Sequence, residues 1–414
     1  MLGTERPPLN IWYISAYDQP EGFSSRTFDY AMELCRLGHS VTMFTNSYCH
    51  FTHKERLAKN EEWRLELYGP LRVIWMKTIP YAGNGWLRGA NMVSNAVQIQ
   101  KIGGRLAPPD IAIGPSVPLL TGLSAYLLSK RKKSVFIFEV RDIWPQALVD
   151  LGYFGKKNVI YFVLRMMEKY LYARAARISA VLPLTGDHVR DGGQDPRKVV
   201  WLPNGINLDR FAGLPPYSGG ETGKLRVMYI GGFSTAHDVM TIIKAASILS
   251  RNDIGGIEFI IAGQGEGREA CVAEAERLKL ANVVFHEPVP KKNIPEFQLR
   301  ADLLISSVKD LPVYQFGINS NKIYDYLASG RPIIFAGKAP NDPVKESGGG
   351  LSISSQDPEQ MADAILHFLH MQPRERKEIG SRSRAYAENQ LDIRVLARRY
   401  EALLFDAIRE RRHE

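Results

Sequence analysis

Short apolar runs that read as strands alternate with longer helical segments, and this alternation starts twice along the chain. The first series opens with a strand at 9–14, a helix at 26–37 and a strand at 41–45. The second series opens with a strand at 225–230, and a helix and a further strand follow it. Such alternation is typical of parallel sheets covered by helices on both faces. We therefore expect an α/β protein with two Rossmann-like, doubly wound domains that face a central cleft.

The boundary between the two domains is expected where the first series ends. A chain of 414 residues is long enough for two domains. Residues 215–223 are rich in Pro, Gly and Ser, which is the composition of a linker. We place an N-terminal Rossmann-like domain at 1–208 and a C-terminal Rossmann-like domain at 209–390. A closing helix at about 391–414 is expected to pack back near the N-terminal domain.

Positive charge is concentrated in the first half of the chain. Residues 1–205 contain 26 Lys and Arg against 17 Asp and Glu, whereas residues 206–414 contain 27 of each. The N-terminal half is therefore expected to meet something anionic, such as a membrane surface or a lipid phosphate. No nucleic-acid partner is expected, because no basic run interleaved with aromatic residues and no recognised nucleic-acid motif occurs.

One segment of this basic half, residues 158–177, reads as a helix with an apolar stripe and several basic residues. The stripe consists of Val159, Phe162, Val163, Met166, Met167 and Tyr170. A helix of this kind can lie on anionic lipid. It can equally pack its stripe on the sheet and keep a solvated basic face. The sequence leaves both interpretations open.

The cellular location is inferred from cysteine usage and from hydropathy. Cys35, Cys49 and Cys271 have no paired spacing, which indicates a reducing compartment. No apolar run approaches the length that spans a bilayer, and the N-terminus does not read as a signal peptide. We expect a cytoplasmic protein that is peripheral to the inner face of the membrane.

A second feature of the chain is a short helix expected at 321–328, which Asn319 or Ser320 can cap. The first turn of such a helix offers unpaired N–H groups and a positive dipole end, which suit phosphate. Lys322 adds a full charge, and Asp325 lies one turn further on the same face. A cation for phosphates and a carboxylate for vicinal hydroxyls predict a nucleotide-sugar site. An ordinary capped helix with a surface Lys–Asp pair is the alternative.

A cluster of polar residues follows the apolar strand expected at 134–140. Glu139, Arg141, Asp142 and Trp144 stand within six residues at the carboxyl edge of that strand. Open α/β sheets place their ligands at such edges. We interpret Glu139, Arg141 and Asp142 as catalytic candidates, and the alternative is a structural salt-bridge cluster.

The sequence predicts neither a cofactor nor a metal. Residues 263–267, Gly-Gln-Gly-Glu-Gly, are not the dinucleotide-binding fingerprint. No H-E-x-x-H, C-x-x-C or D-x-D triplet occurs, so no compact set of metal ligands can be recognised. Phosphates would then have to be neutralised by Lys, Arg and helix ends.

Six motifs, taken in order, resemble family GT4 of the GT-B glycosyltransferases, and the likeness extends over nearly the whole chain. It is closest to the WbuB-like branch, which is associated with O-antigen and capsule assembly. The motifs are Glu21-Gly22 and residues 139–145 (EVRDIWP), 202–211 (LPNGINLDRF), 229–232 (YIGG), 261–265 (IAGQG) and 321–332 (NKIYDYLASGRP).

The resemblance implies retaining transfer of a sugar from a nucleotide-diphosphate sugar, without a metal. Asp325 stands where the family grips the ribose, and Lys322 with the amides of Asn319, Ser320 and Asn321 would hold the diphosphate. Gly22 would approach the diphosphate from the other domain, and Gly265 and Val289 would flank the base. The residues Glu139, Arg141 and Asp142 stand where the family contacts the transferred sugar or the acceptor.

The chain departs from the family pattern at the diphosphate clamp. The first acidic residue of the family, eight positions before Asp325, is Gly317 here. The usual Arg and Lys after the strand at 225–230 are replaced by Gly232 and His237. Lys322 must therefore carry more of the clamp. His237 is either a weaker substitute or a histidine of the helix cap region.

Three functions remain open at this point. The first is transfer of a UDP-linked sugar to a lipid-linked or polysaccharide acceptor in O-antigen, capsule or exopolysaccharide synthesis. The second is epimerisation of a sugar nucleotide by a GT-B enzyme. The third is a non-catalytic subunit that binds a sugar nucleotide or a lipid, which the missing acid at Gly317 keeps open.

Overall fold

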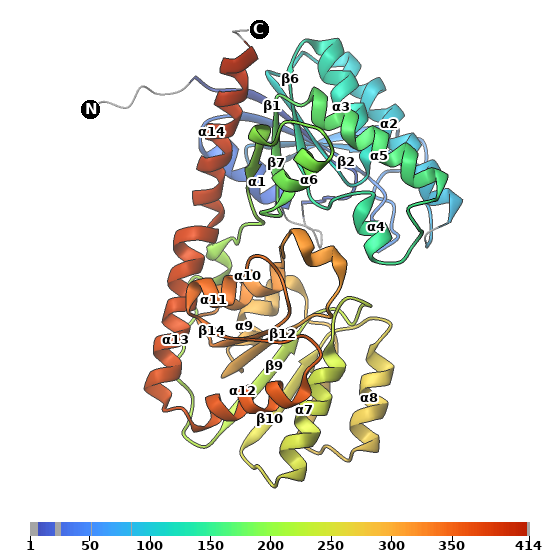
Figure 1. The fold of residues 1–414 in the computed structure, drawn as a ribbon. Coiled ribbons are helices and arrows are strands. Elements are labelled where there is room, and N and C mark those ends of the chain that lie inside the picture. The colour runs from blue at the N-terminus through green and yellow to red at the C-terminus, as the bar shows by residue number, and fades with distance from the viewer. Residues whose placement is uncertain (1–6, 21–25, 51, 84, 412–414) are drawn as a thin grey trace, which may run out of the picture. The chain divides into compact units, whose positions relative to one another are not determined.

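The computed structural model describes residues 7–20, 26–50, 52–83 and 85–411. Contacts within the chain divide it into two units (Figure 1): unit 1 is residues 1–203 with 393–414, and unit 2 is residues 204–392. The division falls a few residues before the expected boundary at 208. The passage 215–223, which has linker composition, lies inside unit 2, where Tyr217 is buried.

Unit 1 is built on an eight-stranded sheet with the order β3-β4-β2-β1-β5-β6-β7-β8. Neighbouring strands are parallel, apart from the antiparallel pair β3 and β4. The strands are β1 (Asn10–Ile14), β2 (Ser40–Asn46), β3 (Trp63–Tyr68), β4 (Leu71–Met76), β5 (Ile111–Pro115), β6 (Val135–Val140), β7 (Arg177–Ala180) and β8 (Val199–Trp201).

Helices cover both faces of this sheet, because successive side chains of a buried strand point to opposite sides. The helices of unit 1 are α1 (Arg26–Arg36), α2 (Trp86–Arg105), α3 (Leu119–Lys132), α4 (Gln146–Asp150), α5 (Val159–Arg174), α6 (Thr185–Asp191) and α14 (Ile393–Arg411). In β1, Ile11 and Tyr13 share a core with α1 and α14. On the opposite face α2, α3 and α5 lie side by side, with α3 in the middle (Figure 1). The C-terminal helix is therefore an integral layer of unit 1.

Unit 2 has a six-stranded parallel sheet with the order β11-β10-β9-β12-β13-β14. The strands are β9 (Leu225–Ile230), β10 (Ile257–Ala262), β11 (Val283–His286), β12 (Leu303–Ser307), β13 (Ile333–Ala336) and β14 (Gly350–Ile353). The helices are α7 (Val239–Arg251), α8 (Arg268–Arg277), α9 (Ile294–Gln298), α10 (Asn321–Ala328), α11 (Pro343–Ser347), α12 (Pro358–His370) and α13 (Pro373–Tyr386). One core packs α7 and α12 on the sheet, and the other packs α10 on its opposite face.

The predicted fold class, two doubly wound α/β halves, is confirmed. Strands β3, β8 and β14 were not predicted. Among the described residues, no helix is both long and apolar enough to cross a bilayer.

The structure contradicts one of the two interpretations of helix α5, the one in which its apolar stripe packs on the sheet. Its apolar stripe does not pack on the sheet, because Val159, Phe162, Val163, Met166 and Tyr170 are exposed. Of the predicted stripe only Met167 is half-buried.

Candidate functional site

Helix α10 of unit 2 starts at Asn321, where it was predicted, but its predicted side-chain cap is not formed. Ser320 occupies the cap position and makes no side-chain hydrogen bond to the first turn. The Asn319 Oδ1 atom instead accepts hydrogen bonds from the Asn204 backbone N–H (2.9 Å) and the Tyr324 hydroxyl (3.0 Å). Because Ser320 does not cap the first turn, the N–H groups of that turn can receive an anion.

Asn204 ties the start of unit 2 to this helix end. Its Nδ2 atom donates to the Asn321 Oδ1 atom at 2.9 Å, in addition to the bond from its backbone to Asn319. The side chains of Asn319 and Asn321 therefore hold the Asn204 loop, and only their backbone amides are available to a ligand. Asn204 was not among the predicted site residues, although it lies in the motif at 202–211.

Lys322 extends from α10 toward the end of β9. Its Nζ atom donates a hydrogen bond to the Tyr229 hydroxyl at 2.8 Å and lies 4.0 Å from the centre of that ring. A Cβ atom on Gly231 would come within 2.5 Å of the Nζ atom, so this glycine leaves the space that Lys322 occupies. Burial lowers the pKa of Lys322 to about 7. The ammonium group is therefore held in place and poorly compensated before any ligand binds.

His237 lies close to Lys322, but it does not replace the missing cation. Burial and the neighbouring Lys322 charge lower the pKa of His237 to about 3, so its ring is neutral at pH 7. Its Nδ1 atom is 2.9 Å from the Ser234 Oγ atom, and it precedes Asp238, the cap residue of α7. Its place directly before the cap residue of α7 is compatible with a cap-region histidine, and a role of His237 toward a diphosphate stays a prediction. Gly232 has open space around it, since a Cβ atom there would meet nothing closer than 3.8 Å.

Asp325 is paired with Arg210, a residue that the sequence analysis did not single out. The Arg210 Nη1 atom lies 2.9 Å from the Asp325 Oδ1 atom, and its Nη2 atom donates to the Lys291 carbonyl at 3.0 Å. Burial raises the pKa of Asp325, and Arg210 and Lys291 act against this rise. Lys322 and Asp325 thus have separate partners, and no ion pair joins them in the described part of the chain. Arg210 belongs to the motif at 202–211, which could have indicated it.

Two further residues predicted to bind the donor are Gly265, in the loop after β10, and Val289, between β11 and α9. Gly265 has φ +144°, and a Cβ atom there would come within 2.8 Å of the Phe233 carbonyl oxygen. The loop after β10 therefore packs tightly on the turn after β9, which carries Gly231. Val289 is half-buried between β11 and α9 and packs against the core that contains α10.

The position of the expected first acidic residue has an unusual backbone. Gly317 has φ +125° and ψ +173°, a region that is essentially restricted to glycine. The missing carboxylate therefore coincides with a backbone that would be strained by any side chain.

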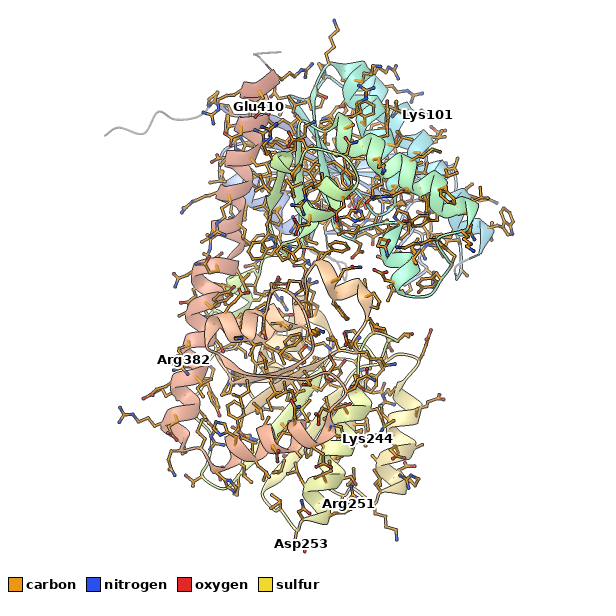
Figure 2. The ribbon with its side chains drawn as sticks, viewed as in Figure 1. Lys101, Lys244, Arg251, Asp253, Arg382 and Glu410 are labelled. Carbon is orange, nitrogen blue, oxygen red and sulfur yellow. The ribbon has the colours of Figure 1, made fainter. Side chains whose placement is uncertain are left out.

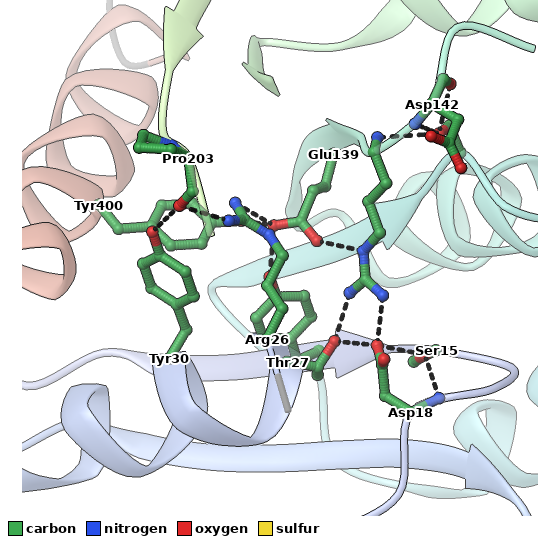
Figure 3. Close-up of polar contacts among 12 residues, drawn as sticks. Ser15, Asp18, Arg26, Thr27, Tyr30, Glu139, Asp142, Pro203 and Tyr400 are labelled. Carbon is green, nitrogen blue, oxygen red and sulfur yellow. Dashed lines mark hydrogen bonds and ion pairs between the residues drawn. The ribbon is translucent and has the colours of Figure 1, made fainter. Parts of the chain in front are cut away.

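In unit 1, Glu139 is fully buried at the end of β6 and is surrounded by donors (Figure 3). Its Oε1 atom accepts from Arg141 Nε at 2.8 Å. Its Oε2 atom accepts from Arg26 Nη2 at 3.2 Å, from the Tyr400 hydroxyl at 3.3 Å and from the Tyr13 hydroxyl. Burial alone would raise the pKa of Glu139, but Arg26 and Arg141 outweigh it and hold the pKa at about 2. Glu139 is therefore a permanently charged internal anion.

Arg141 links this anion to the loop after β1. In addition to Glu139, its guanidinium contacts the Asp18 carboxylate and the Thr27 hydroxyl (Figure 3). The structure thus brings Glu139 and Arg141 together as a buried ion-pair network, which was the alternative interpretation of this segment. Asp18 and Arg26 were not predicted, because a buried pair of opposite charges far apart in sequence leaves no local pattern.

Asp142 differs from its two neighbours because its side chain is exposed. Its backbone carbonyl accepts from the Ser116 Oγ atom at 3.1 Å, and no ion pair holds its carboxylate within the described ranges. Of the three predicted catalytic residues, Asp142 is the one with a carboxylate that solvent can reach, although the protein atoms around it raise its pKa and Arg141 acts against this rise. Gly22 lies outside the described residues.

The described residues contain no group of three or more His, Cys, Asp or Glu side chains that could hold a metal ion. The positive charges and N–H groups around α10 are groups that can receive a diphosphate.

Comparisons with known proteins concern the family and the fold of the chain. A family model described as "Glycosyl transferases group 1" matches residues 224–371, and one described as "Glycosyl transferase 4-like domain" matches residues 21–205. Two relatives are WbjE of Pseudomonas aeruginosa and TuaH of Bacillus subtilis. WbjE, named as a probable glycosyltransferase, is 22% identical over 64% of this chain and 67% of its own length. TuaH, named as a teichuronic acid biosynthesis glycosyltransferase, is 23% identical over 53% of each chain, so the match spans about half of TuaH.

Solved structures share the fold over almost the whole chain. Sucrose-phosphate synthase from Thermosynechococcus elongatus superposes with a TM-score of 0.73 at 15% identity, covering 96% of this chain and 98% of that one. HepE from Anabaena, solved with UDP-glucose, superposes with a TM-score of 0.65 at 13% identity, covering 96% and 99%. These likenesses confirm the predicted fold.

Proposed function

The chain belongs to the group 1 (GT4) glycosyltransferases, and from this premise we propose that it moves a sugar from a nucleoside diphosphate to a lipid-linked or polysaccharide acceptor. The observation that carries the proposal is the position of Lys322. Its ammonium group stands at the uncapped start of α10, in the space left by Gly231.

The leaving diphosphate is the group that this arrangement would stabilise. Glycosyl transfer develops negative charge on the diphosphate and positive charge on the sugar ring. Preorganised donors aimed at a developing charge are usually the largest contribution to catalysis. Lys322 and the first-turn N–H groups of α10 would receive the diphosphate, and they need no metal to do so.

Asp325 would accept the ribose hydroxyls in this proposal. It is held by Arg210 in the ligand-free chain, and its carboxylate keeps acceptor capacity on its second oxygen. Arg210 then acts as a positioning residue that keeps Asp325 ionised against the effect of burial.

In unit 1 we assign different roles to the three predicted catalytic residues. Asp142 is exposed and can contact the acceptor or the transferred sugar. Arg141 and Glu139 act as positioning residues, because their charged groups are engaged with each other and with Asp18 and Arg26. They fix the loop that carries Asp142.

The substrate class is inferred from relatives and from charge. HepE was solved with UDP-glucose and TuaH is named for teichuronic acid biosynthesis, which supports a UDP-linked donor and a cell-surface polysaccharide product. The resemblance to the WbuB-like branch supports a product among O-antigen, capsule or exopolysaccharide. The basic N-terminal half suits work at the anionic inner face of a membrane.

The test is thermal stabilisation of the purified chain by a panel of nucleotides and nucleotide sugars, with EDTA present. A ligand at about 100 times its dissociation constant should stabilise by roughly 2.7 kcal/mol. We expect a shift with UDP or a UDP-sugar in the wild type and its loss in Lys322→Ala. If no nucleotide stabilises the wild type, or if Lys322→Ala responds as the wild type does, the donor site is misplaced.

A further inference from the structure

Helix α5 exposes an apolar stripe to solvent and buries its single acidic residue on the side where Leu171 and Tyr172 are also buried. Its one acidic residue, Glu168, is buried and accepts hydrogen bonds from the Tyr172 hydroxyl (2.9 Å) and pairs with His188 (2.9 Å). Its apolar stripe faces solvent instead: Val159 is 75% exposed, Phe162 56% and Met166 65%. A soluble helix normally buries such a stripe, so this orientation requires a further explanation.

The two helices beside α5 continue the apolar surface. Helix α3 contacts both α2 and α5, and it exposes Leu127. Helix α2 exposes Trp86, Val93 and Val97, which follow one another at helical spacing. We call the solvent-facing side of α2, α3 and α5 the outer face; its three helices lie side by side in Figure 1.

The charge of these three helices is almost entirely positive. They contain nine Lys and Arg and a single acidic residue, the buried Glu168. The basic residues are Arg88, Lys101, Arg105, Lys130, Arg131, Lys132, Arg165, Lys169 and Arg174. Lys156 and Lys157 are exposed directly before α5, and Lys169 is exposed beside Tyr170. The outer face therefore combines exposed apolar side chains with an excess of cations, of which Lys101 pairs with Glu62 and Arg165 with Glu168.

We propose that the outer face docks on the surface of an anionic lipid bilayer, with α5 lying in the plane of the interface. A helix of this kind inserts its apolar side chains at the boundary of headgroups and acyl chains, while its basic residues contact anionic headgroups. The docking is separate from donor binding and can be measured without any nucleotide.

The charge pattern favours this occupant over a second copy of the chain. Two outer faces brought together would oppose cation to cation, because neither carries an exposed acid that could pair with the other. A nucleic acid would leave the exposed Val, Phe and Met side chains without an apolar partner. A bilayer with anionic lipid satisfies both the apolar and the charged part of the surface.

The experiment is co-sedimentation of the full chain with vesicles of neutral phosphatidylcholine, alone or with about a third of an anionic phosphatidylglycerol. The wild type is expected to bind the anionic vesicles and to be released by high salt. Phe162→Gln/Met166→Gln should lower the partition coefficient about tenfold or more, since two apolar side chains no longer insert. Lys157→Glu/Lys169→Glu should lower it by a similar factor.

Matched controls lie elsewhere on the molecule. Lys244→Glu/Arg251→Glu makes the same change in net charge on unit 2, at the positions labelled in Figure 2, and should leave vesicle binding unchanged. Leu67→Gln removes an exposed apolar side chain from β3 and should also leave vesicle binding unchanged. Each variant should melt within about a degree of the wild type, because the changed side chains are exposed.

Two results would overturn the proposal. One is a wild type that stays in the supernatant with anionic vesicles. The other is an equal loss of binding in the unit 2 control, which would show that net charge alone is responsible. If Phe162→Gln/Met166→Gln instead abolished a concentration-dependent dimer of a chain that binds no vesicles, the outer face would be an interface between copies.

Discussion

At the scale of single residues, the position of the Lys322 ammonium depends on a side chain that is absent. Gly231 and Gly232 are adjacent and look equivalent in the sequence, yet only a Cβ atom on Gly231 would meet Lys322, at 2.4 Å from its Cε atom. The second glycine has no neighbour closer than 3.8 Å. Gly232 was predicted because it stands where the family carries a basic residue, whereas the room that Gly231 leaves for Lys322 is a contact that no sequence pattern shows.

This difference predicts that two conservative variants will differ in their affinity for UDP. Gly231→Ala should displace Lys322 and weaken UDP binding by about tenfold, the cost of losing one charge-assisted hydrogen bond. Gly232→Ala should bind UDP as the wild type does. Calorimetric titration of both variants measures this, and equal affinities would show that the position of Lys322 is irrelevant to the donor.

The lowered pKa of Lys322 predicts a pH dependence of donor binding. In the free chain this pKa is about 7, so the lysine is charged below pH 7 and increasingly neutral above it. A diphosphate needs the charged form, and binding above pH 7 must therefore take up a proton. The affinity for UDP should fall by up to about tenfold per unit between pH 7 and pH 9. The slope should vanish in Lys322→Met; the same slope in that variant would assign the titration to another group.

The backbone conformation at Gly317 predicts that a glutamate introduced there will not restore the role of the family's first acidic residue. The backbone at φ +125° and ψ +173° is strained for any residue with a side chain, at a cost of about 1–3 kcal/mol. Gly317→Glu and Gly317→Ala should therefore lose similar amounts of unfolding free energy, and the carboxylate should bring no gain in transfer rate. A faster Gly317→Glu enzyme with unchanged thermal stability would contradict this account.

At the scale of elements, the buried anion Glu139 connects three parts of unit 1 that are far apart in sequence. Arg26 comes from α1, Arg141 from the loop after β6 and Tyr400 from α14 (Figure 3). Arg26 and Tyr30 also donate to the Pro203 carbonyl, both at 2.8 Å, where the chain leaves unit 1. The network therefore fixes the end of β6 and the exit of the chain together.

Removing this charge should destabilise unit 1 strongly. Glu139→Gln leaves the buried Arg26 guanidinium without its anion and leaves Arg141 with Asp18 alone, which costs about 3–5 kcal/mol, whereas Tyr400→Phe should cost about 1 kcal/mol. Chemical denaturation measures both.

The Glu139 pKa of about 2 lies below its unfolded value, so its stabilisation is present at neutral pH and is lost as the pH falls from about 5 to 2. Glu139→Gln should reduce the fall of the unfolding free energy between about pH 5 and pH 2. An unchanged pH dependence would show that another group titrates in this range.

The elements themselves were largely predictable, and the contacts between them were not. Buried strands and amphipathic helices leave a periodic pattern, and α10 was predicted with its observed ends. Strands β3, β8 and β14 lie at or near sheet edges, where exposure weakens that pattern. The pairs Asp325–Arg210 and Glu139–Arg26 join residues more than a hundred positions apart, so no local pattern could indicate them.

At the scale of the whole molecule, the excess of basic residues and the proposed donor site belong to different units. Unit 1 contains the basic outer face and the exposed Asp142, and unit 2 contains Lys322 and Asp325. The charge asymmetry between the two halves was visible in the sequence. The exposure of the apolar stripe of α5 was not visible, because an apolar stripe reads the same whether it faces a core or solvent.

The most direct test of the central claim, that Lys322 holds the leaving diphosphate, is a comparison of UDP and uridine affinities in wild type and Lys322→Met. Methionine keeps the length of the side chain and removes the charge. The account predicts a loss of about tenfold to a hundredfold in UDP affinity, with uridine affinity unchanged, because only the diphosphate contacts the ammonium. Equal losses for UDP and uridine, or no loss for either, would contradict it.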